Sequence, residues 1–220
     1  MPMTRFARHA ALFALSLLVA GFSVTLARAS DEPTDPQYFK VTNVASDDVL
    51  NVRAEPNGSA AIVGSLKPDA FPVEVFARQG DWGRIVFADA NGWVSMNFLA
   101  PFAIAVVPGT KLPEGLVCGG TEPFWSAEVV GTDKLTFGTP DTAGLTFSIT
   151  HSGPFVARSN ADFIWAADTG ENRAAASIRR QMCSDGMSDR DYPMSIDLLL
   201  RNDSSADAFE GCCSLPVFEK

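Results

Sequence analysis

The chain has 220 residues, with 17 Lys or Arg against 26 Asp or Glu, and therefore a formal net charge of −9. An acidic surface repels nucleic acid and anionic lipid headgroups, and no cluster of Lys and Arg interrupts it, so we expect no nucleic-acid partner. After residue 29, no stretch is long and apolar enough to span a bilayer.

Residues 1–29 have the three parts of a signal peptide. Arg5, Arg8 and His9 form a basic start, an apolar run follows over about residues 10–26, and Ala27-Arg28-Ala29 offers small residues to a signal peptidase. We expect cleavage after Ala29, with a retained membrane anchor as the alternative. Cleavage removes three arginines and no acid, which leaves a periplasmic or secreted chain of charge −12 with no stable membrane insertion.

The mature chain is expected to begin with a disordered lead-in followed by a small all-β module. Residues 30–37 contain two prolines and three acids and no large apolar side chain. From residue 38 to 100, short alternating runs between turn residues predict an SH3-like barrel. The expected strands are residues 38–44, 49–53, 61–66, 73–78, 82–87 and 92–94.

Three segments of this module resemble bacterial SH3 domains, over residues 38–99. They are LNVRAEP at 50–56, GDWGRI at 80–85 and GWV at 92–94. The resemblance implies a wall-targeting or peptide-binding module of an envelope protein. Gly83 departs from the family, which usually has a bulkier residue there, and we expect this glycine to flatten any groove beside Trp82.

An exposed aromatic side chain with polar neighbours is typical of a shallow recognition patch. The candidate ligand-binding residues of the first module are Tyr38, Asn51, Arg53 and Trp82. The alternative is structural: Trp82 and Trp93 pack within the barrel, and Arg53 pairs with an acid such as Asp48 or Glu55.

A linker over residues 101–115 is expected to join this module to a second one over residues 116–220. The apolar part of the linker, residues 102–107, is interpreted as a strand that closes one of the modules. In the second module, runs at 128–130, 134–137, 144–149, 155–158, 162–165, 174–181, 194–200 and 208–211 predict an antiparallel β-barrel or sandwich. Residues 174–181 have helical propensity, but the run is short and has no helical apolar stripe, so we favour a strand.

The second module carries three motifs, CGGTEPFW at 118–125, CSDGMSDRDYP at 183–193 and GCC at 211–213. Together they resemble a family of uncharacterised envelope proteins and lipoproteins, similar in plan to the META domain and to lysozyme-inhibitor barrels. The resemblance implies a fold but no settled activity.

All four cysteines, Cys118, Cys183, Cys212 and Cys213, lie in the second module, and we expect them to form two disulfides. Neighbouring cysteines on a strand point to opposite faces, so Cys212 and Cys213 are not expected to bond to each other. Two pairings remain, in which Cys118 and Cys183 each take one of the vicinal pair. No Cys-x-x-Cys spacing is present, so we expect no metal site and no cofactor.

Candidate ligand-binding residues of the second module lie in the motifs: Glu122, Trp125, Asp185, Asp189 and Arg190. The alternative is again structural, with Asp185 and Ser188 forming a tight turn and Arg190 held by an acid such as Glu122.

No constellation supports an enzyme, because His151 is the only histidine of the mature chain and only Cys118 precedes it. An envelope hydrolase that uses His151 or Glu122 is the less favoured alternative. The sequence predicts a secreted cell-envelope binding protein, whose partner is peptidoglycan or an envelope protein or peptide. The alternative is a periplasmic inhibitor of a lysozyme-like enzyme.

Overall fold

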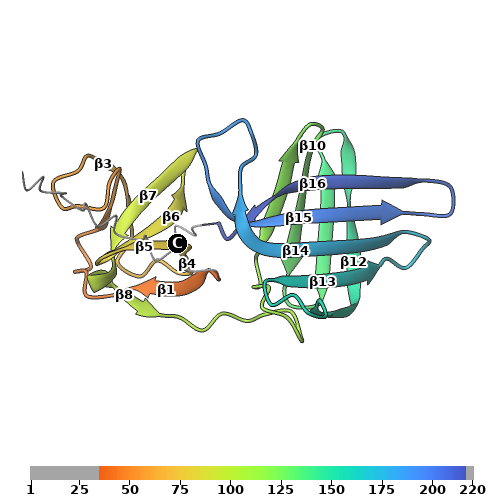
Figure 1. Ribbon diagram of the computed structural model, residues 1–220, viewed down its shortest axis with the longest axis horizontal. Coiled ribbons are helices and arrows are strands. Elements are labelled where there is room, and N and C mark those ends of the chain that lie inside the picture. The colour runs from red at the N-terminus through yellow and green to blue at the C-terminus, as the bar shows by residue number, and fades with distance from the viewer. Residues whose placement is uncertain (1–34, 217–220) are drawn as a thin grey trace, which may run out of the picture.

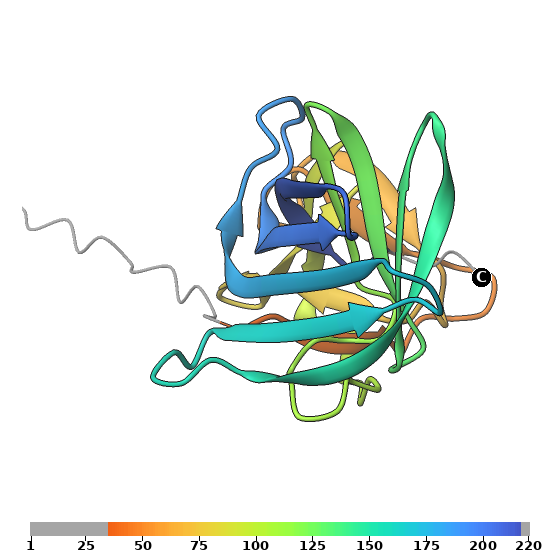
Figure 2. The same ribbon diagram turned by 90° about the vertical axis from the view of Figure 1, so that its right-hand side faces the viewer.

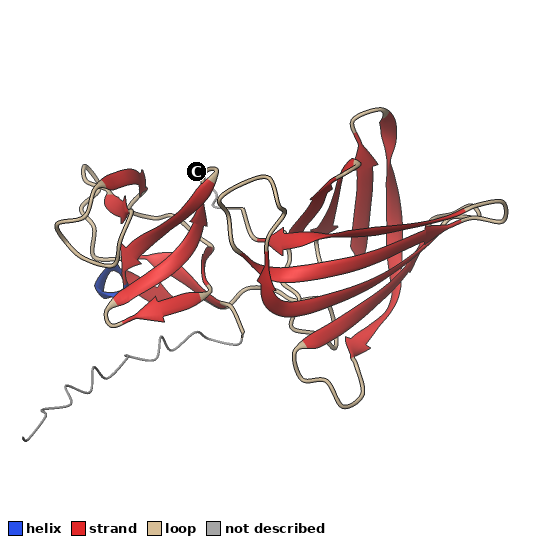
Figure 3. Ribbon diagram, turned by 45° about the horizontal axis from the view of Figure 1, so that its top comes forward, coloured by secondary structure: helices blue, strands red, loops and turns tan. Residues whose placement is uncertain are grey.

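The computed structural model describes residues 35–216 and has two β modules side by side (Figure 1). Strands make up nearly all of the regular structure, and a single turn of 3-10 helix, η1 at Met96–Phe98, is the helical element within those residues (Figure 3). The all-β class is thus confirmed. The expected signal peptide and residues 30–34 of the expected lead-in lie outside the described residues.

The first module consists of two antiparallel sheets that share one core. The sheets have the strand orders β4-β1-β8 and β3-β2-β7-β6-β5. Since β1 pairs with both β4 and β8, the first and last strands of the module lie side by side. The strands are β1 Gln37–Val41, β2 Leu50–Arg53, β3 Ile62–Leu66, β4 Val73–Val75, β5 Ala77–Gln79, β6 Trp82–Phe87, β7 Ala90–Ser95 and β8 Leu99–Pro101.

Alternation along these strands places one face of each in the core. Val52, Ile85 and Val94 are fully buried there, on β2, β6 and β7. Gly83 belongs to the same inward set, and a Cβ at this position would lie 2.7 Å from the Met96 sulfur and 2.9 Å from Val75. The expectation that Gly83 flattens a surface groove is therefore wrong, because this residue faces the core and makes room for Val75 and Met96.

The second module is a closed eight-stranded antiparallel barrel, which Figure 2 shows from its end. Strand β9 pairs with both β10 and β16 and so closes the ring. The strands are β9 Val117–Thr121, β10 Phe124–Val130, β11 Lys134–Thr139, β12 Thr142–Pro154, β13 Ala161–Ala167, β14 Arg173–Cys183, β15 Tyr192–Arg201 and β16 Ala206–Ser214.

The barrel core takes side chains from the segment that we expected to be a linker. Val107 and Leu112 are fully buried and belong to the same cluster as Phe147 and Leu198. Residues 102–107 do not form the expected strand; β8 ends at Pro101, and Val106 makes only an isolated bridge to Pro113. The segment therefore packs against the barrel rather than spanning freely between the modules.

The barrel strands differ from the expectation in two places. Residues 155–158 are not a strand but part of the turn between β12 and β13, while β9 was not predicted. The strand interpretation of residues 174–181 is confirmed, because β14 spans this segment and pairs with β13 as far as Arg179 and with β15 as far as Arg180.

Both disulfides form, and one of the two open pairings is realised. Cys118 bonds to Cys213 and joins β9 to β16, whereas Cys183 bonds to Cys212 and joins the end of β14 to β16. Cys118 and Cys213 are direct cross-strand neighbours, so their bond reinforces the closure of the barrel.

Candidate binding cleft between the modules

The loop over residues 184–191, which joins β14 to β15, is organised by the carboxylate of Asp185. This group accepts hydrogen bonds from the backbone N–H groups of Met187 and Ser188, at 3.0 and 2.8 Å, and from the hydroxyls of Ser188 and Tyr192, at 2.8 and 3.1 Å. Burial acts to raise the pKa of Asp185, but these four bonds outweigh it and lower the pKa to about 2. The expected turn of Asp185 and Ser188 is confirmed.

This loop docks on the hairpin between β6 and β7, beside which it rises in Figure 1. The side-chain amide of Asn91 donates to the backbone carbonyl of Asp191 at 3.0 Å, and its oxygen accepts from the Asp191 N–H at 2.8 Å. Arg84 pairs with the Asp191 carboxylate at 2.6 Å, and Arg190 pairs with Asp89 at 2.7 Å. An acid holds Arg190, as expected, but this acid is Asp89 of the docked hairpin rather than Glu122.

A cleft of about 600 Å³ lies between the hairpin, this loop and the barrel wall, and we call it the interdomain cleft. Its polar groups include the side chains of Thr121, Ser126, Arg190, Tyr192 and Ser214, and its apolar surface comes from both modules. The remaining lining residues are Val86, Phe87, Ala88, Val117, Cys118, Gly119, Gly120, Asp185, Cys212, Leu215 and Pro216.

The cleft combines hydrogen-bonding groups with apolar walls, which is the usual make-up of a small-ligand site. The Nε atom of Arg190 is buried and makes no hydrogen bond within the described part of the chain. Hydroxyls can donate and accept, whereas the guanidinium only donates. The arrangement is therefore suited to a polar ligand rich in carbonyl or hydroxyl oxygens, such as a peptide or a sugar.

A second cavity of about 590 Å³ is lined entirely by the barrel. It shares Gly119, Gly120, Thr121, Asp185 and Cys212 with the interdomain cleft, so the two hollows adjoin along β9 and the 184–191 loop. Its other polar walls include the ion pair between Arg179 and Asp197, whose atoms are 2.5 Å apart.

Trp125 explains Gly120 of the first motif, and together with the Gly119 backbone it explains Gly211 of the third. Its ring is buried and packs against Phe137 and Phe209, with centroids 6.0 and 5.6 Å away. A Cβ on Gly120 would lie 2.3 Å from the Trp125 Nε1, and one on Gly211 would lie 2.8 Å from its ring. The indole thus belongs to the core, and although Trp125 lines the barrel cavity, only 6% of the residue is exposed, which limits it as a ligand contact.

Of the four candidates on the first module, three share a face. On β7, Trp93 and Ser95 are two residues apart and face the same side of the sheet. Trp93 is the cross-strand partner of Arg53, and Ser95 is the partner of Trp82. Trp82, Trp93 and Arg53 therefore lie on one side of the sheet. Asn51 precedes Arg53 by two residues on β2 and faces the same side. Both tryptophans are half-buried.

The contacts of two candidates differ from the expectation. Arg53 donates to the backbone carbonyl of Ala60 at 2.8 Å, rather than pairing with Asp48 or Glu55. Tyr38 lies on the other sheet, opposite Glu74, and burial together with the nearby Glu74 carboxyl raises its pKa well above the usual range. Tyr38 therefore does not belong to the Trp82 face.

The candidates on the barrel also lie apart from one another. Asp185 and Arg190 line the interdomain cleft, Glu122 lines only the barrel cavity, and Asp189 is exposed at the loop surface. His151 lines neither hollow; it pairs with Trp165 between β12 and β13. Cys118 is held in its disulfide.

Sequence reasoning did not single out Asn91, Arg84, Asp191 or Tyr192, which build the cleft. The last two were visible in the CSDGMSDRDYP motif, so that motif marked the right loop. The signal for Arg84 and Asn91 was absent, because their contacts join residues about 100 positions apart.

Comparison with known proteins identifies the first module and not the second. Residues 48–100 match the family model of the bacterial SH3 domain, which covers about a quarter of the chain. No curated protein and no solved structure matches the chain. The resemblance of the barrel to META and lysozyme-inhibitor domains stays a prediction.

Between residues 35 and 216, no group of three or more His, Cys, Asp or Glu side chains gathers to hold a metal ion. In the same part of the chain, no helix has the length and apolar character needed to cross a bilayer.

Proposed function

We propose that this protein binds a cell-envelope ligand, peptidoglycan or an envelope peptide, in the interdomain cleft. The observation that carries the proposal is that a bacterial SH3 module and the Asp185 loop of the barrel build one cleft together. Two disulfides support a location outside the cytoplasm, where such ligands occur.

The cleft has the size and chemistry for one or two units of a polar polymer. Its volume of about 600 Å³ falls within the range of small-ligand sites. The Arg190 guanidinium and the Tyr192 hydroxyl offer hydrogen bonds beside the apolar Phe87 and Leu215. The Trp82 face of the SH3 module is linked to the cleft through Arg84, which reaches Asp191, so a longer ligand can contact both.

Cosedimentation with purified sacculi tests the proposal. Ser126 lines the cleft from an exposed position on β10, so Ser126→Trp should fill it without disturbing the core. We expect the wild-type chain to cosediment and Ser126→Trp to lose at least about tenfold in affinity, or about 1.4 kcal/mol. Ser148→Trp, an exposed β12 position outside both cavities, is the matched control and should bind as wild type.

Two results would overturn the proposal. One is a wild-type chain that stays in the supernatant with sacculi and with soluble envelope peptides. The other is equal binding by the two tryptophan variants. Loss of binding on Trp82→Ala but not on Ser126→Trp would move the site from the cleft to the SH3 face.

The inhibitor of a lysozyme-like enzyme is the second candidate, and it has less support. An acidic loop that enters a basic cleft needs free carboxylates, but Asp185 is bonded inside the loop and Asp191 pairs with Arg84. Only Asp189 among the loop acids projects without a partner within residues 35–216. A lysozyme assay with the full chain decides this alternative, since unchanged turnover would exclude it.

A further inference from the structure

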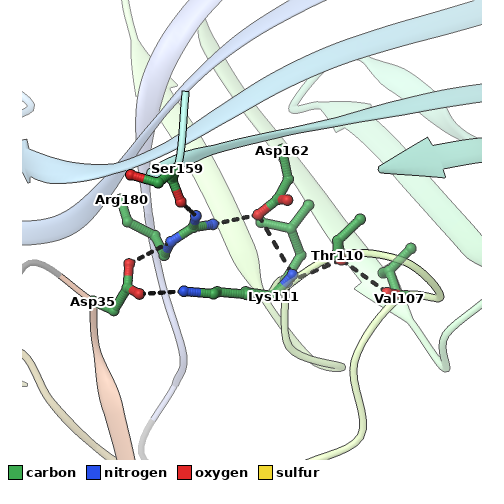
Figure 4. Close-up of polar contacts among 8 residues, drawn as sticks. Asp35, Val107, Thr110, Lys111, Ser159, Asp162 and Arg180 are labelled. Carbon is green, nitrogen blue, oxygen red and sulfur yellow. Dashed lines mark hydrogen bonds and ion pairs between the residues drawn. The ribbon is translucent and has the colours of Figure 1, made fainter. Parts of the chain in front are cut away.

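A third cavity, of about 630 Å³, lies where the segment before β1 meets the barrel and residue Lys111. Figure 4 shows the polar contacts in it, which converge on Arg180 of β14. Phe76 and Met182 add apolar walls. None of the residues used in the interdomain cleft takes part.

The Arg180 side chain is buried, with only 3% of it exposed, and three groups accept its hydrogen bonds. Nη1 donates to the Asp162 carboxylate, Nη2 to the backbone carbonyl of Ser159 at 2.5 Å, and Nε to Asp35 at 2.6 Å. A buried guanidinium needs such partners because its desolvation is costly. Asp162 is equally buried, so Arg180 and Asp162 form a neutral pair inside the barrel wall.

Asp35 differs from these internal partners. Its carboxylate is more exposed, at 38%, and each of its oxygens contacts a different cation: Oδ1 contacts Arg180 and Oδ2 contacts the Lys111 ammonium, both at 2.6 Å (Figure 4). Burial acts to raise the pKa of Asp35, but the hydrogen bonds from Lys111 and Arg180 outweigh it and lower the pKa. Asp35 reaches the cavity from the chain before β1, whereas both cations belong to residues after β8.

The Arg180 guanidinium and the backbone that carries Lys111 are held in place without Asp35. Asp162 and Ser159 fix the guanidinium, and the Arg180 backbone N–H donates to the carbonyl of Asn160 at 2.8 Å. The turn that carries Lys111 is fixed by the Thr110 hydroxyl, which donates to the Val107 carbonyl and accepts from the Leu112 N–H. The Arg180 part of the site keeps its geometry without Asp35 and is preorganised for binding, whereas the Lys111 ammonium lies on a side chain that is 61% exposed and has to be positioned by its anionic partner.

The charge balance favours an anion in this place. Arg180 and Asp162 cancel, Lys111 adds one positive charge, and Asp35 neutralises it. Without Asp35, the cavity would carry a net charge of about +1 in a protein that is otherwise strongly acidic. Arg180 and Lys111 each contact one oxygen of the Asp35 carboxylate. The same two cations can therefore bind the carboxylate of another molecule with matching charge and geometry.

We propose that Arg180 and Lys111 form a carboxylate-binding site that Asp35 occupies as a tethered ligand, and that an external carboxylate competes with Asp35 for it. The chemical class is a small acid or peptide terminus with a free carboxylate and a short apolar group to face Phe76 and Met182. This site is separate from the interdomain cleft and does not depend on what the cleft binds.

Binding of N-acetylglycine to the full mature chain tests the proposal, with its N-methylamide as a probe that has no carboxylate. Removal of the tethered competitor raises the fraction of binding-competent sites, so Asp35→Asn should bind N-acetylglycine at least about tenfold more tightly than wild type by calorimetry. The amide should bind to neither protein. Asp197→Asn is the matched control, because it frees Arg179, a guanidinium that is one-third exposed, and should gain no affinity.

Failure of Asp35→Asn to gain affinity would overturn the proposal, as would an equal gain in Asp197→Asn. If Asp35→Asn proves unstable, the wild-type chain supplies the test through the NMR signal of the Arg180 Nε–H. This signal should shift and saturate on titration with N-acetylglycine but not with the amide, and Lys111→Met should weaken the effect. A signal that the acid leaves unchanged means that Asp35 is only a structural tie.

Discussion

Glu74 carries a carboxyl group that folding places at the junction of the two modules. Its Oε2 accepts a hydrogen bond from the backbone N–H of Leu215, just after β16, at 2.8 Å. Its Oε1 is buried and finds no hydrogen-bond partner among residues 35–216. Burial raises the pKa of Glu74 to about 8, and the bond from Leu215 opposes this rise only in part.

This shift makes the stability of the protein depend on pH. Between the ordinary pKa of 4.5 and about 8, the unfolded state releases the Glu74 proton while the folded state keeps it. The free energy of unfolding therefore falls as pH rises through this window, and Glu74 adds no further dependence above it. We expect Glu74→Gln to match wild type near pH 5 and to be more stable by on the order of a few kcal/mol near pH 8.

Urea unfolding at the two pH values measures this difference. The side-chain amide that Glu74→Gln introduces keeps an oxygen for the Leu215 N–H and has no charge to bury. Glu171→Gln, in the exposed turn between β13 and β14, is the control and should leave the pH dependence unchanged. Parallel profiles for wild type and Glu74→Gln would show that the carboxyl is ionised in the folded protein.

The shape of the 184–191 loop depends on a single side chain, that of Asp185. We expect Asp185→Asn to loosen the loop, because an amide can accept fewer of the four hydrogen bonds that Asp185 receives. The backbone amides of Met187 and Ser188 should then exchange with solvent at least about tenfold faster, a loss of about 1.4 kcal/mol of protection.

Hydrogen exchange followed by NMR gives this readout residue by residue. Asp189→Asn removes the same charge from the same loop at an exposed position and should change neither rate. In wild type the Asp185 contribution should be present above pH 3.8 and be lost as the pH falls through about 2, since the folded pKa is the lower one. Equal exchange in both variants would contradict the organising role of Asp185.

At the level of strands, alternation and turn residues predicted most of the architecture. Strand β6 has the expected bounds, and β14 was recognised despite its helical propensity. The missed β9 contains Gly119 and Gly120, which lower strand propensity but make room for Trp125 across the sheet. The false strand at 155–158 contains Val156, an apolar residue that is 97% exposed in a turn, and hydrophobicity alone could not reveal this.

The candidate site, like the strands, was predictable only where local sequence patterns carry the information. The motif at 183–193 identified the loop, and the vicinal cysteines reduced the disulfide pairings to two. Local sequence could not show that the loop docks on the β6–β7 hairpin, because the two segments are about 100 residues apart. Nor could it show that Tyr38 lies on the other sheet and that the Trp125 ring packs in the barrel core, since an aromatic residue in a short strand can face either side.

Across the whole molecule, polar contacts between the modules determine how firmly the two walls of the interdomain cleft are fixed relative to each other. Modules joined by a small interface usually move relative to each other. Here Asn91 makes two hydrogen bonds to the Asp191 backbone, Arg84 adds an ion pair, and Glu74 binds the chain after β16. These contacts come from two places on the SH3 module, the β6–β7 hairpin and β4, and thus restrain its rotation.

Asn91 is the contact that a substitution can remove without changing the charge of the chain. Asn91→Ala deletes both bonds to Asp191 and leaves two backbone groups to find water, which should cost roughly 1 to 3 kcal/mol of interface free energy. We expect the modules of this variant to tumble more independently, so that ¹⁵N relaxation gives them separate and shorter correlation times. Sacculus binding through the cleft should weaken in parallel.

Asn57→Ala is the matched control, because the Asn57 side chain bonds only within its own turn, to Ser59 and Glu55. It should leave the relaxation of both modules and the binding unchanged. A single correlation time for both modules of Asn91→Ala would mean that Arg84, Glu74 and the Asp35 contacts hold the modules together by themselves. In that case several contacts each contribute to the interface between the modules, and the loss of one is not enough to free them. Weakening the interface then requires Arg84→Met combined with Asn91→Ala.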